Sequence, residues 1–170
     1  MEAITTEAIN PVTTTGDREG KYLTFSLAGE EYGIGILKVR EIIGLMTVTA
    51  VPQAPRYVKG VINLRGKVIP VIDLRLKFGM DAAEYTERTC IIVMEIKCGD
   101  RKIAMGIVVD SVSEVLSIKG GDIEDAPSFG ASLDTSCILG MAKSEQGVKI
   151  LLDIDRVMRS DEMASIGIAA

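Results

Sequence analysis

Few residues in this sequence of 170 could do chemistry, because the chain contains no histidine. That absence excludes Ser-His-Asp and Cys-His catalysis, and it removes the commonest base near neutral pH and the commonest metal ligand. Two pairs of carboxylates, Glu30 with Glu31 and Asp153 with Asp155, could in principle share acid–base work. Their positions instead predict a hairpin turn for the first pair and a strand end for the second, where acids face solvent or cap a helix. The sequence therefore predicts a protein that is not an enzyme.

The cysteines and glycines likewise form no recognisable ligand site. Cys90, Cys98 and Cys137 make no C-x-x-C pair, and a zinc site would normally add a histidine or a fourth cysteine. The stretch "RGKV" lacks the rest of a phosphate-binding loop, and "GIGILK" lacks the third glycine of a dinucleotide-binding fingerprint. We expect reduced thiols, no metal and no cofactor.

One segment of this acidic chain is strongly basic. The chain has 24 Asp and Glu against 19 Lys and Arg, a net charge of −5. Between residues 53 and 78 Asp73 is the only acid, and the basic residues are Arg56, Lys59, Arg65, Lys67, Arg75 and Lys77. Gly66 favours a tight turn, which would place Arg65 beside it. A guanidinium suits a protein interface because its planar fork binds carboxylates through two hydrogen bonds, so we interpret this hairpin as a docking surface, with a solvated arginine as the alternative.

The sequence contains two copies of one unit. Residues 32–43 align with 105–116 at a shift of 73, and residues 60–74 align with 140–154 at a shift of 80. Two matches in the same order predict a duplicated unit of roughly 70 residues. The copies differ at the hairpin, which reads "NLRGKV" in the first and "KSEQGV" in the second. The matched positions include Gly33 with Gly106, Gly60 with Gly140, and Asp73 with Asp153.

Short runs rich in Val and Ile, separated by turn residues, predict strands, and closure into barrels would leave no strand edge exposed. We therefore expect an all-β fold of two small antiparallel barrels. Apolar residues at helical spacing predict a short C-terminal helix: Ile154, Val157, Met158 and Met163. The expected divisions are a flexible tail at 1–19, a first barrel at 20–83, a second barrel at 84–152, and the C-terminal helix and tail at 153–170.

The expected location is the cytoplasm. The longest apolar runs are far shorter than the roughly 20 residues that span a bilayer. The N-terminal residues lack the basic start and the apolar stretch of a signal peptide.

Val39 and Glu41 form a second candidate surface, in the stretch "LKVREI". Strand alternation would place both side chains on one side of the sheet, whereas a helical turn would separate them. Val112 and Glu114 repeat the pattern in the second copy, which also fits a purely structural role.

Several stretches together resemble the CheW family of adaptor proteins in bacterial chemotaxis. The strongest is "VKGVINLRGKVIPVIDLRLKFG", in which "GVINLRG" followed by "IPVIDLR" is a specific signature of this domain. The resemblance continues through "LAGEEYGIGILKVREII", "VPQAPRYVKG", "IVVDSVSEVLSI", "APSF" and "ILLDIDRVM", and it covers about residues 20 to 165. It implies a fold of two SH3-like five-stranded barrels, consistent with the duplication.

The resemblance also implies a function. CheW proteins are non-enzymatic adaptors that couple the cytoplasmic tip of methyl-accepting chemoreceptors to the histidine kinase CheA, so this protein would be recruited to membrane receptor arrays through its partners. The family's receptor-binding surface lies at the groove between the barrels, and the first barrel also docks the kinase's homologous regulatory domain. A loop of the second barrel, here carrying Phe129, would make the other contact in the array. The family's motif positions fall on Val39, Glu41, Lys59, Gly60, Asn63, Leu64, Arg65 and Gly66.

Two other hypotheses stay open. An adaptor of the same fold could serve a chemosensory-like pathway that controls pili or development. A nucleic-acid-binding barrel would belong to a different class, but near the basic segment only Tyr57 and Phe78 could stack on bases, and the net charge is negative.

Overall fold

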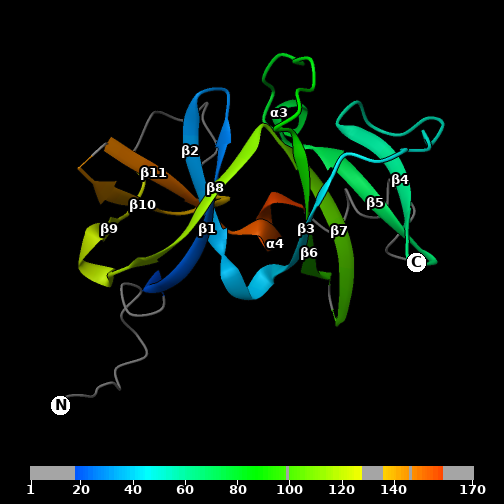
Figure 1. Ribbon diagram of the computed structural model, residues 1–170. Helices are drawn as coiled ribbons and strands as arrows, with labels where there is room; N and C mark the ends of the chain where they lie inside the picture. The colour runs from blue at the N-terminus through cyan, green and yellow to red at the C-terminus, as the bar shows by residue number, and fades with distance from the viewer. Residues whose placement is uncertain (1–17, 99, 128–135, 146, 159–170) are drawn as a thin grey trace.

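Eleven strands form two sheets in the computed structural model, which describes residues 18–98, 100–127, 136–145 and 147–158 (Figure 1). The all-β prediction is confirmed. We call the five-stranded sheet the first barrel; its order is β3 (Val39–Gly44), β6 (Cys90–Cys98), β7 (Arg101–Val109), β5 (Lys67–Asp73), β4 (Val58–Leu64). We call the six-stranded sheet the second barrel; its order is β8 (Ser111–Ile118), β1 (Gly20–Leu27), β2 (Glu30–Gly35), β11 (Gly147–Leu152), β10 (Ile138–Ser144), β9 (Ile123–Glu124).

Both sheets close on themselves in the same way. In the first barrel, the segment that follows β3 reaches the edge strand β4, where Thr49 and Val61 exchange two backbone hydrogen bonds of 2.8 Å. In the second barrel, the segment that follows β8 forms β9, which pairs with the edge strand β10. The second sheet has six strands rather than the expected five because this closing segment is itself a short strand. The arrangement agrees with two SH3-like barrels.

Each barrel takes strands from both copies of the duplicated unit. The β1–β2 hairpin of the first copy lies in the second barrel, where β1 pairs with β8 and β2 pairs with β11. The β6–β7 hairpin of the second copy lies in the first barrel, where β6 pairs with β3 and β7 pairs with β5. The expected division into barrels at 20–83 and 84–152 therefore does not describe the strand pairing. Aligning two copies shows which strands are equivalent, but not which copy supplies each strand's partner.

Glycines at the parallel pairings of the exchanged hairpins are tightly surrounded, Gly106 by strand β6 of its own hairpin and Gly33 by its parallel partner β11. Gly106 of β7 pairs with Val71 of β5, and Gly33 of β2 pairs with Leu151 of β11. A Cβ at Gly106 would lie 2.7 Å from Ile91 Cγ2, and a Cβ at Gly33 would lie 2.9 Å from Leu151 Cδ2. Both distances are too short for ordinary packing, so the repeated glycines are explained by the structure.

The largest cluster of buried apolar side chains lies between the two barrels. The parallel strands are buried on both faces, so successive side chains point alternately into this cluster and into a barrel interior. Ile72 of β5 enters this cluster, while its neighbour Val71 enters the interior of the first barrel. The second barrel has a smaller interior cluster of its own. The shared cluster contains Leu23, Phe25, Leu27, Tyr32, Ile34, Ile72, Leu74, Ile92, Met94, Ile96, Met105, Ile107, Val109, Leu152, Ile154, Val157 and Met158. The barrels are thus joined by a continuous core.

Two short helices end the two copies. Asp73 caps α3 (Leu74–Lys77) by accepting a hydrogen bond from Leu76 N at 3.3 Å. Asp153 caps α4 (Ile154–Val157) by accepting one from Asp155 N at 3.2 Å. The expected C-terminal helix is therefore present at α4, which lies between the barrels (Figure 1), while residues 159–170 lie outside the described residues. Sequence analysis missed α3, although the repeated aspartate pointed to it.

The acidic pair at the start of β2 lies beside the first hairpin turn rather than in it. Ala28 and Gly29 make the turn, with positive φ angles of 54° and 85°, and Glu30 and Glu31 begin the next strand.

Within the described residues, no helix is long and apolar enough to cross a bilayer. The same residues hold no group of three or more Cys, Asp or Glu side chains placed to bind a metal ion.

Candidate partner-binding site

The β4–β5 hairpin ends in a two-residue turn that presents Arg65. Arg65 and Gly66 have positive φ angles of 53° and 87°, the combination found in type I′ hairpin turns. The side-chain oxygen of Asn63 accepts a hydrogen bond from Gly66 N at 2.8 Å, which fixes the turn from inside. The structure therefore shows the tight turn that the sequence predicts, and it explains the roles of Asn63 and Gly66 as shaping residues.

Arg65 is paired with Glu41 rather than left as an isolated cation. Its Nη1 lies 2.6 Å from Glu41 Oε2 and its Nη2 lies 2.7 Å from Glu41 Oε1. The hydrogen bonds from Arg65 lower the pKa of the Glu41 carboxyl and raise that of the guanidinium. The arginine side chain remains 70% exposed, so the pair presents an oriented, largely open guanidinium at the protein surface.

A groove on the first barrel runs beside this ion pair. Its apolar residues come from the hairpin and from the neighbouring strands, while its charged residues stand around them. The lining residues are Arg40, Glu41, Leu64, Arg65, Lys67, Ile69, Val93 and Ala104. Apolar surface flanked by three basic side chains suits a partner that offers apolar residues together with a carboxylate.

A bulge in β3 separates Val39 from Glu41. Val39 pairs with Met94, whereas Glu41 pairs with the next residue of β6, Val93, so Arg40 is an extra residue in the ladder. Met94 enters the core between the barrels, and Val93 enters the interior of the first barrel. Strand alternation placed Val39 and Glu41 on the same side. The bulge instead directs Val39 to the shared core and Glu41 to the groove.

Two other candidate residues lie at the opposite end of β4. The Lys59 ammonium stands 5.4 Å from the ring centre of Tyr85, away from the groove. Gly60 is buried, and a Cβ there would lie 2.0 Å from the Thr49 carbonyl oxygen. Gly60 is therefore explained by barrel closure. Phe129 lies outside the described residues.

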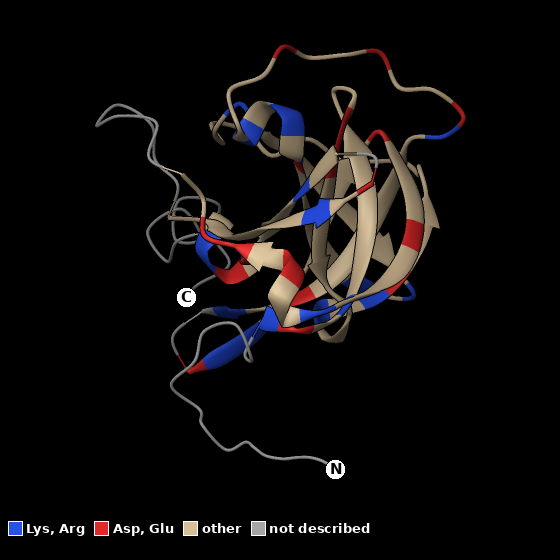
Figure 2. Cartoon of the chain, turned by 90° about the vertical axis from the view of Figure 1, so that its left-hand side faces the viewer, with Lys and Arg blue, Asp and Glu red and all other residues tan. Residues whose placement is uncertain are grey.

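The basic segment does not form one continuous cationic surface. Arg75 forms two hydrogen bonds with Asp110, from Nε to Oδ1 at 2.8 Å and from Nη2 to Oδ2 at 2.6 Å. Lys77 Nζ lies 4.8 Å from the ring centre of Tyr57. Figure 2 shows Lys and Arg distributed over several elements and interspersed with acids. The groove beside Arg65 is thus a local site with mixed charge.

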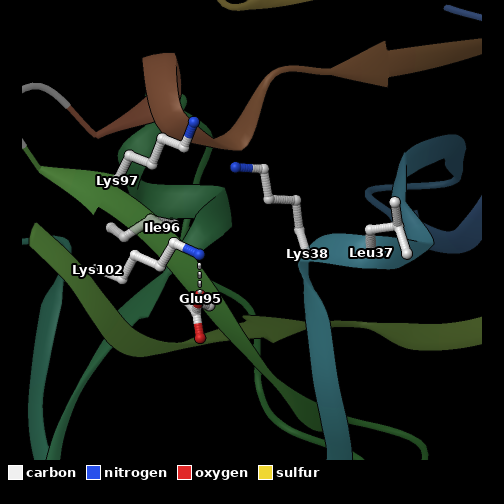
Figure 3. Close-up of a pocket in the computed structure, with 6 residues that line it drawn as sticks. All are labelled: Leu37, Lys38, Glu95, Ile96, Lys97 and Lys102. Carbon is white, nitrogen blue, oxygen red and sulfur yellow. Dashed lines mark ion pairs between the residues drawn. The ribbon is translucent and has the colours of Figure 1, made fainter.

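A second hollow, which sequence analysis did not identify, lies where the barrels meet (Figure 3). It is lined by Leu37, Lys38, Glu95, Ile96, Lys97 and Lys102. Leu37 is in the 3-10 turn η1 (Ile36–Lys38), and its side chain is 96% exposed. It is the most exposed large apolar residue in the described part of the chain, and we take it as a candidate contact residue. Its only signal in the sequence was its place in the connection "GILKV" between two strands.

Comparison with known proteins identifies the family. A CheW-like domain matches residues 21–162. The chain belongs to the CheW-like family. It is 44% identical to the chemotaxis protein CheW of Klebsiella aerogenes, over 86% of each chain. It is 38% identical to the CheW of Rhizobium meliloti, over 88% of this chain and 92% of that one.

A solved CheW structure shares the fold. The scaffolding protein TtCheW from Thermoanaerobacter tengcongensis superposes with a TM-score of 0.72 at 36% sequence identity, covering 82% of this chain and 92% of that chain. The resemblance noted in the sequence is therefore confirmed at the levels of family and fold.

Proposed function

We propose that this chain is a non-enzymatic adaptor that couples chemoreceptors to the histidine kinase CheA in chemotaxis signalling arrays. The observation that carries the proposal is the CheW-like match over residues 21–162. It is supported by relatives named chemotaxis protein CheW, which align with this chain over most of their length. In this role the protein acts in the cytoplasm and reaches the membrane through its partners.

The groove beside Arg65 is the proposed contact for a helical, carboxylate-bearing surface of the receptor tip. Leu64 supplies apolar area, and the Glu41–Arg65 pair holds the guanidinium in a fixed direction beside it. Pre-orientation lowers the conformational entropy lost on binding. A partner carboxylate either joins this pair or competes with Glu41 for the guanidinium.

Leu37, at the hollow between the barrels, is the proposed apolar contact of a second surface. Lys38 beside it is held by Asp155, with 2.6 Å between Nζ and Oδ2, and Lys102 is paired with Glu95 at 3.6 Å. Two of the three lysines that line the hollow are thus paired with carboxylates, while Leu37 stays open to solvent. An apolar residue of a receptor helix would gain contact with Leu37 there.

The first experiment is a calorimetric titration of the full chain against the regulatory domain of CheA from the same organism. Saturable binding with one-to-one stoichiometry is the expected result. A folded protein that shows no binding would contradict the assignment to this kinase. Binding only to the kinase of a pathway for pili or development would move the adaptor to that pathway.

Paired variants then test the two surfaces against a soluble cytoplasmic fragment of the receptor. Arg65→Glu should weaken binding about tenfold or more, because the substitution removes an interface arginine and places a second negative charge beside Glu41. Arg56→Glu is the control, since Arg56 is an exposed basic residue outside the groove. Equal binding by the two variants would remove Arg65 from the interface.

Leu37→Asp should weaken the same interaction about tenfold, while leaving the thermal midpoint unchanged because the side chain touches solvent on nearly all sides. Val148→Asp is its control, an exposed apolar position on β11 of the second barrel. A loss of binding in both variants would indicate a general effect of added charge rather than a contact at Leu37.

A further inference from the structure

Two ion pairs join the barrels at equivalent places with opposite polarity. At the first junction, a cation on α3, Arg75, binds the acid Asp110, which lies between β7 and β8. At the second junction, an acid on α4, Asp155, binds the cation Lys38, which lies between β2 and β3. Figure 3 shows the Lys38 side chain extending toward α4.

The duplication makes the elements of these junctions equivalent, although the two connection residues lie one position apart, because the shift of 73 aligns Asp110 with Leu37 and Lys38 with Ser111. Arg75 and Asp155 are related by the shift of 80 residues, and each stands two positions after the aspartate that caps its helix. In both junctions the carboxylate also accepts a backbone hydrogen bond from the end of the first strand of an exchanged hairpin. Ala28 N lies 2.8 Å from Asp110 Oδ2, and Lys97 N lies 2.8 Å from Asp155 Oδ1. The geometry is therefore repeated while the charges are reversed.

Pairing of like copies from two chains is a competing arrangement for this fold. The two barrels have equivalent strand orders: the first contains three strands of the first copy and a hairpin of the second, and the second contains four strands of the second copy and a hairpin of the first. A hairpin from the same copy of a second chain would have the same backbone pattern. Exchange of equivalent elements between protomers is a common route to unwanted dimers.

We propose that the charge-reversed junctions make the two copies pair with one another and reject pairing between like copies. In a pair of first copies, Arg75 would face Lys38. In a pair of second copies, Asp155 would face Asp110. Every junction of a like pair is thus repulsive, whereas both junctions of the native pair are attractive.

Partial burial strengthens the effect of these charges on which copies pair. The side chains of Arg75 and Asp110 are 21% and 31% exposed, and those of Lys38 and Asp155 are 33% and 25% exposed. Charges removed in part from water interact more strongly than fully solvated ones. The inference concerns how the chain pairs with itself, and it stands independently of receptor and kinase binding.

Two double variants of the full chain separate pairing specificity from simple stabilisation. The first swap is Arg75→Asp with Asp110→Arg, and the second swap is Lys38→Asp with Asp155→Lys. Either swap keeps both native junctions attractive, but it makes all junctions of the like pairs attractive too. Carrying both swaps together makes the like pairs repulsive again. The expected dimer content is therefore raised in each swap and lowered again in the combined variant.

The measurement is light scattering coupled to gel filtration, after refolding from urea at a series of equal protein concentrations. We expect each swap to raise the dimerisation constant about tenfold, equivalent to about 1.4 kcal/mol, and the combined variant to return to the wild-type value. Swapped variants as monomeric as the wild type would overturn the proposal. So would a combined variant that dimerises as much as either swap alone.

Thermal stability provides no substitute for this readout. Every swap removes a carboxylate that accepts a backbone N–H, so the midpoint should fall in all of the variants. Only charge complementarity predicts a dimer content that rises with one swap and falls with two. Circular dichroism confirms that each variant is folded before its association state is read.

Discussion

The two copies of the unit agree at buried positions and differ at the surface. Both contain a glycine where parallel strands meet, an aspartate that caps a helix, and a bulge after a valine that packs into the shared core. Glu41 in the first copy pairs with Arg65, whereas its counterpart Glu114 forms no ion pair within the described residues and bonds through its backbone to Thr24. Packing requirements preserve the repeat, and the surface where the copies diverge is where a partner is expected.

The largest expected difference between equivalent positions concerns the glycines at barrel closure. Gly60→Ala should destabilise the protein by about 3 kcal/mol or more, because the new Cβ would lie 2.0 Å from a backbone oxygen and φ is 143°. Gly140→Ala should cost less, about 1–2 kcal/mol, because its nearest neighbour, at 2.6 Å, is a side-chain methyl group of Ile123 and the nearest backbone atom is 3.2 Å away. Urea denaturation followed by circular dichroism measures both.

Gly35→Ala is the control for these variants, because a Cβ there meets nothing within 4 Å. It should change the free energy of unfolding by less than about 1 kcal/mol. An equal loss in Gly60→Ala and Gly140→Ala would show that Ile123 is held as rigidly as the backbone of the first barrel.

A smaller difference is expected between the two helix-capping aspartates. Asp73 is buried and also accepts a hydrogen bond from the Tyr85 hydroxyl at 2.8 Å, whereas Asp153 is only half-buried. Asp73→Ala should therefore cost about 2–3 kcal/mol and Asp153→Ala about 1 kcal/mol, as measured by urea denaturation. In a Tyr85→Phe background, Asp73→Ala should lower the free energy of unfolding by less than it does in the wild type. Additive losses would show that the hydroxyl contributes nothing through Asp73.

The smallest effect concerns acid stability at the junction between the barrels. Hydrogen bonds from Arg75 and from Ala28 N lower the pKa of Asp110 below its ordinary value. A lowered pKa in the folded state means that this stabilisation is present above about pH 4 and is lost as the pH falls through the folded value. Asp110→Asn should thus cost about 1 kcal/mol at pH 7 and progressively less in acid.

The matching measurement is urea unfolding of wild type and Asp110→Asn between pH 7 and pH 3. Asparagine keeps an oxygen that can accept the Ala28 N–H, so the comparison isolates the ion pair. A stability difference that grows on acidification would contradict the assigned sign.

The sequence was sufficient to predict the duplication, the strand content and the hairpin turn. Those features depend on local chemistry: glycine at close approaches, aspartate at helix starts, and positive φ at Gly66. The family signature followed from the same local stretches. Such features are visible because each is specified by a few neighbouring residues.

The exchange of hairpins and the composition of the groove could not be predicted in this way. Glu41 and Arg65 are 24 residues apart, and they meet only because the barrel closes. The bulge at Arg40 turns the Glu41 side chain to the opposite face of the sheet from Val39, and no marked signal in the sequence indicates it. Long-range pairing and ladder irregularities depend on the whole sheet, so local patterns carry little information about them.

The exchanged hairpins also set the order in which a newly made chain can fold. The β1–β2 hairpin contains Thr24, whose hydroxyl donates a hydrogen bond to the backbone oxygen of Glu114, 90 residues further along the chain. The parallel partner of β2 is β11, which is made later still. Contacts of such long range form slowly, and the strand edges stay open until their partners arrive. The first barrel has all of its strands once β7 is made, whereas the second barrel cannot be completed until β11 has been made.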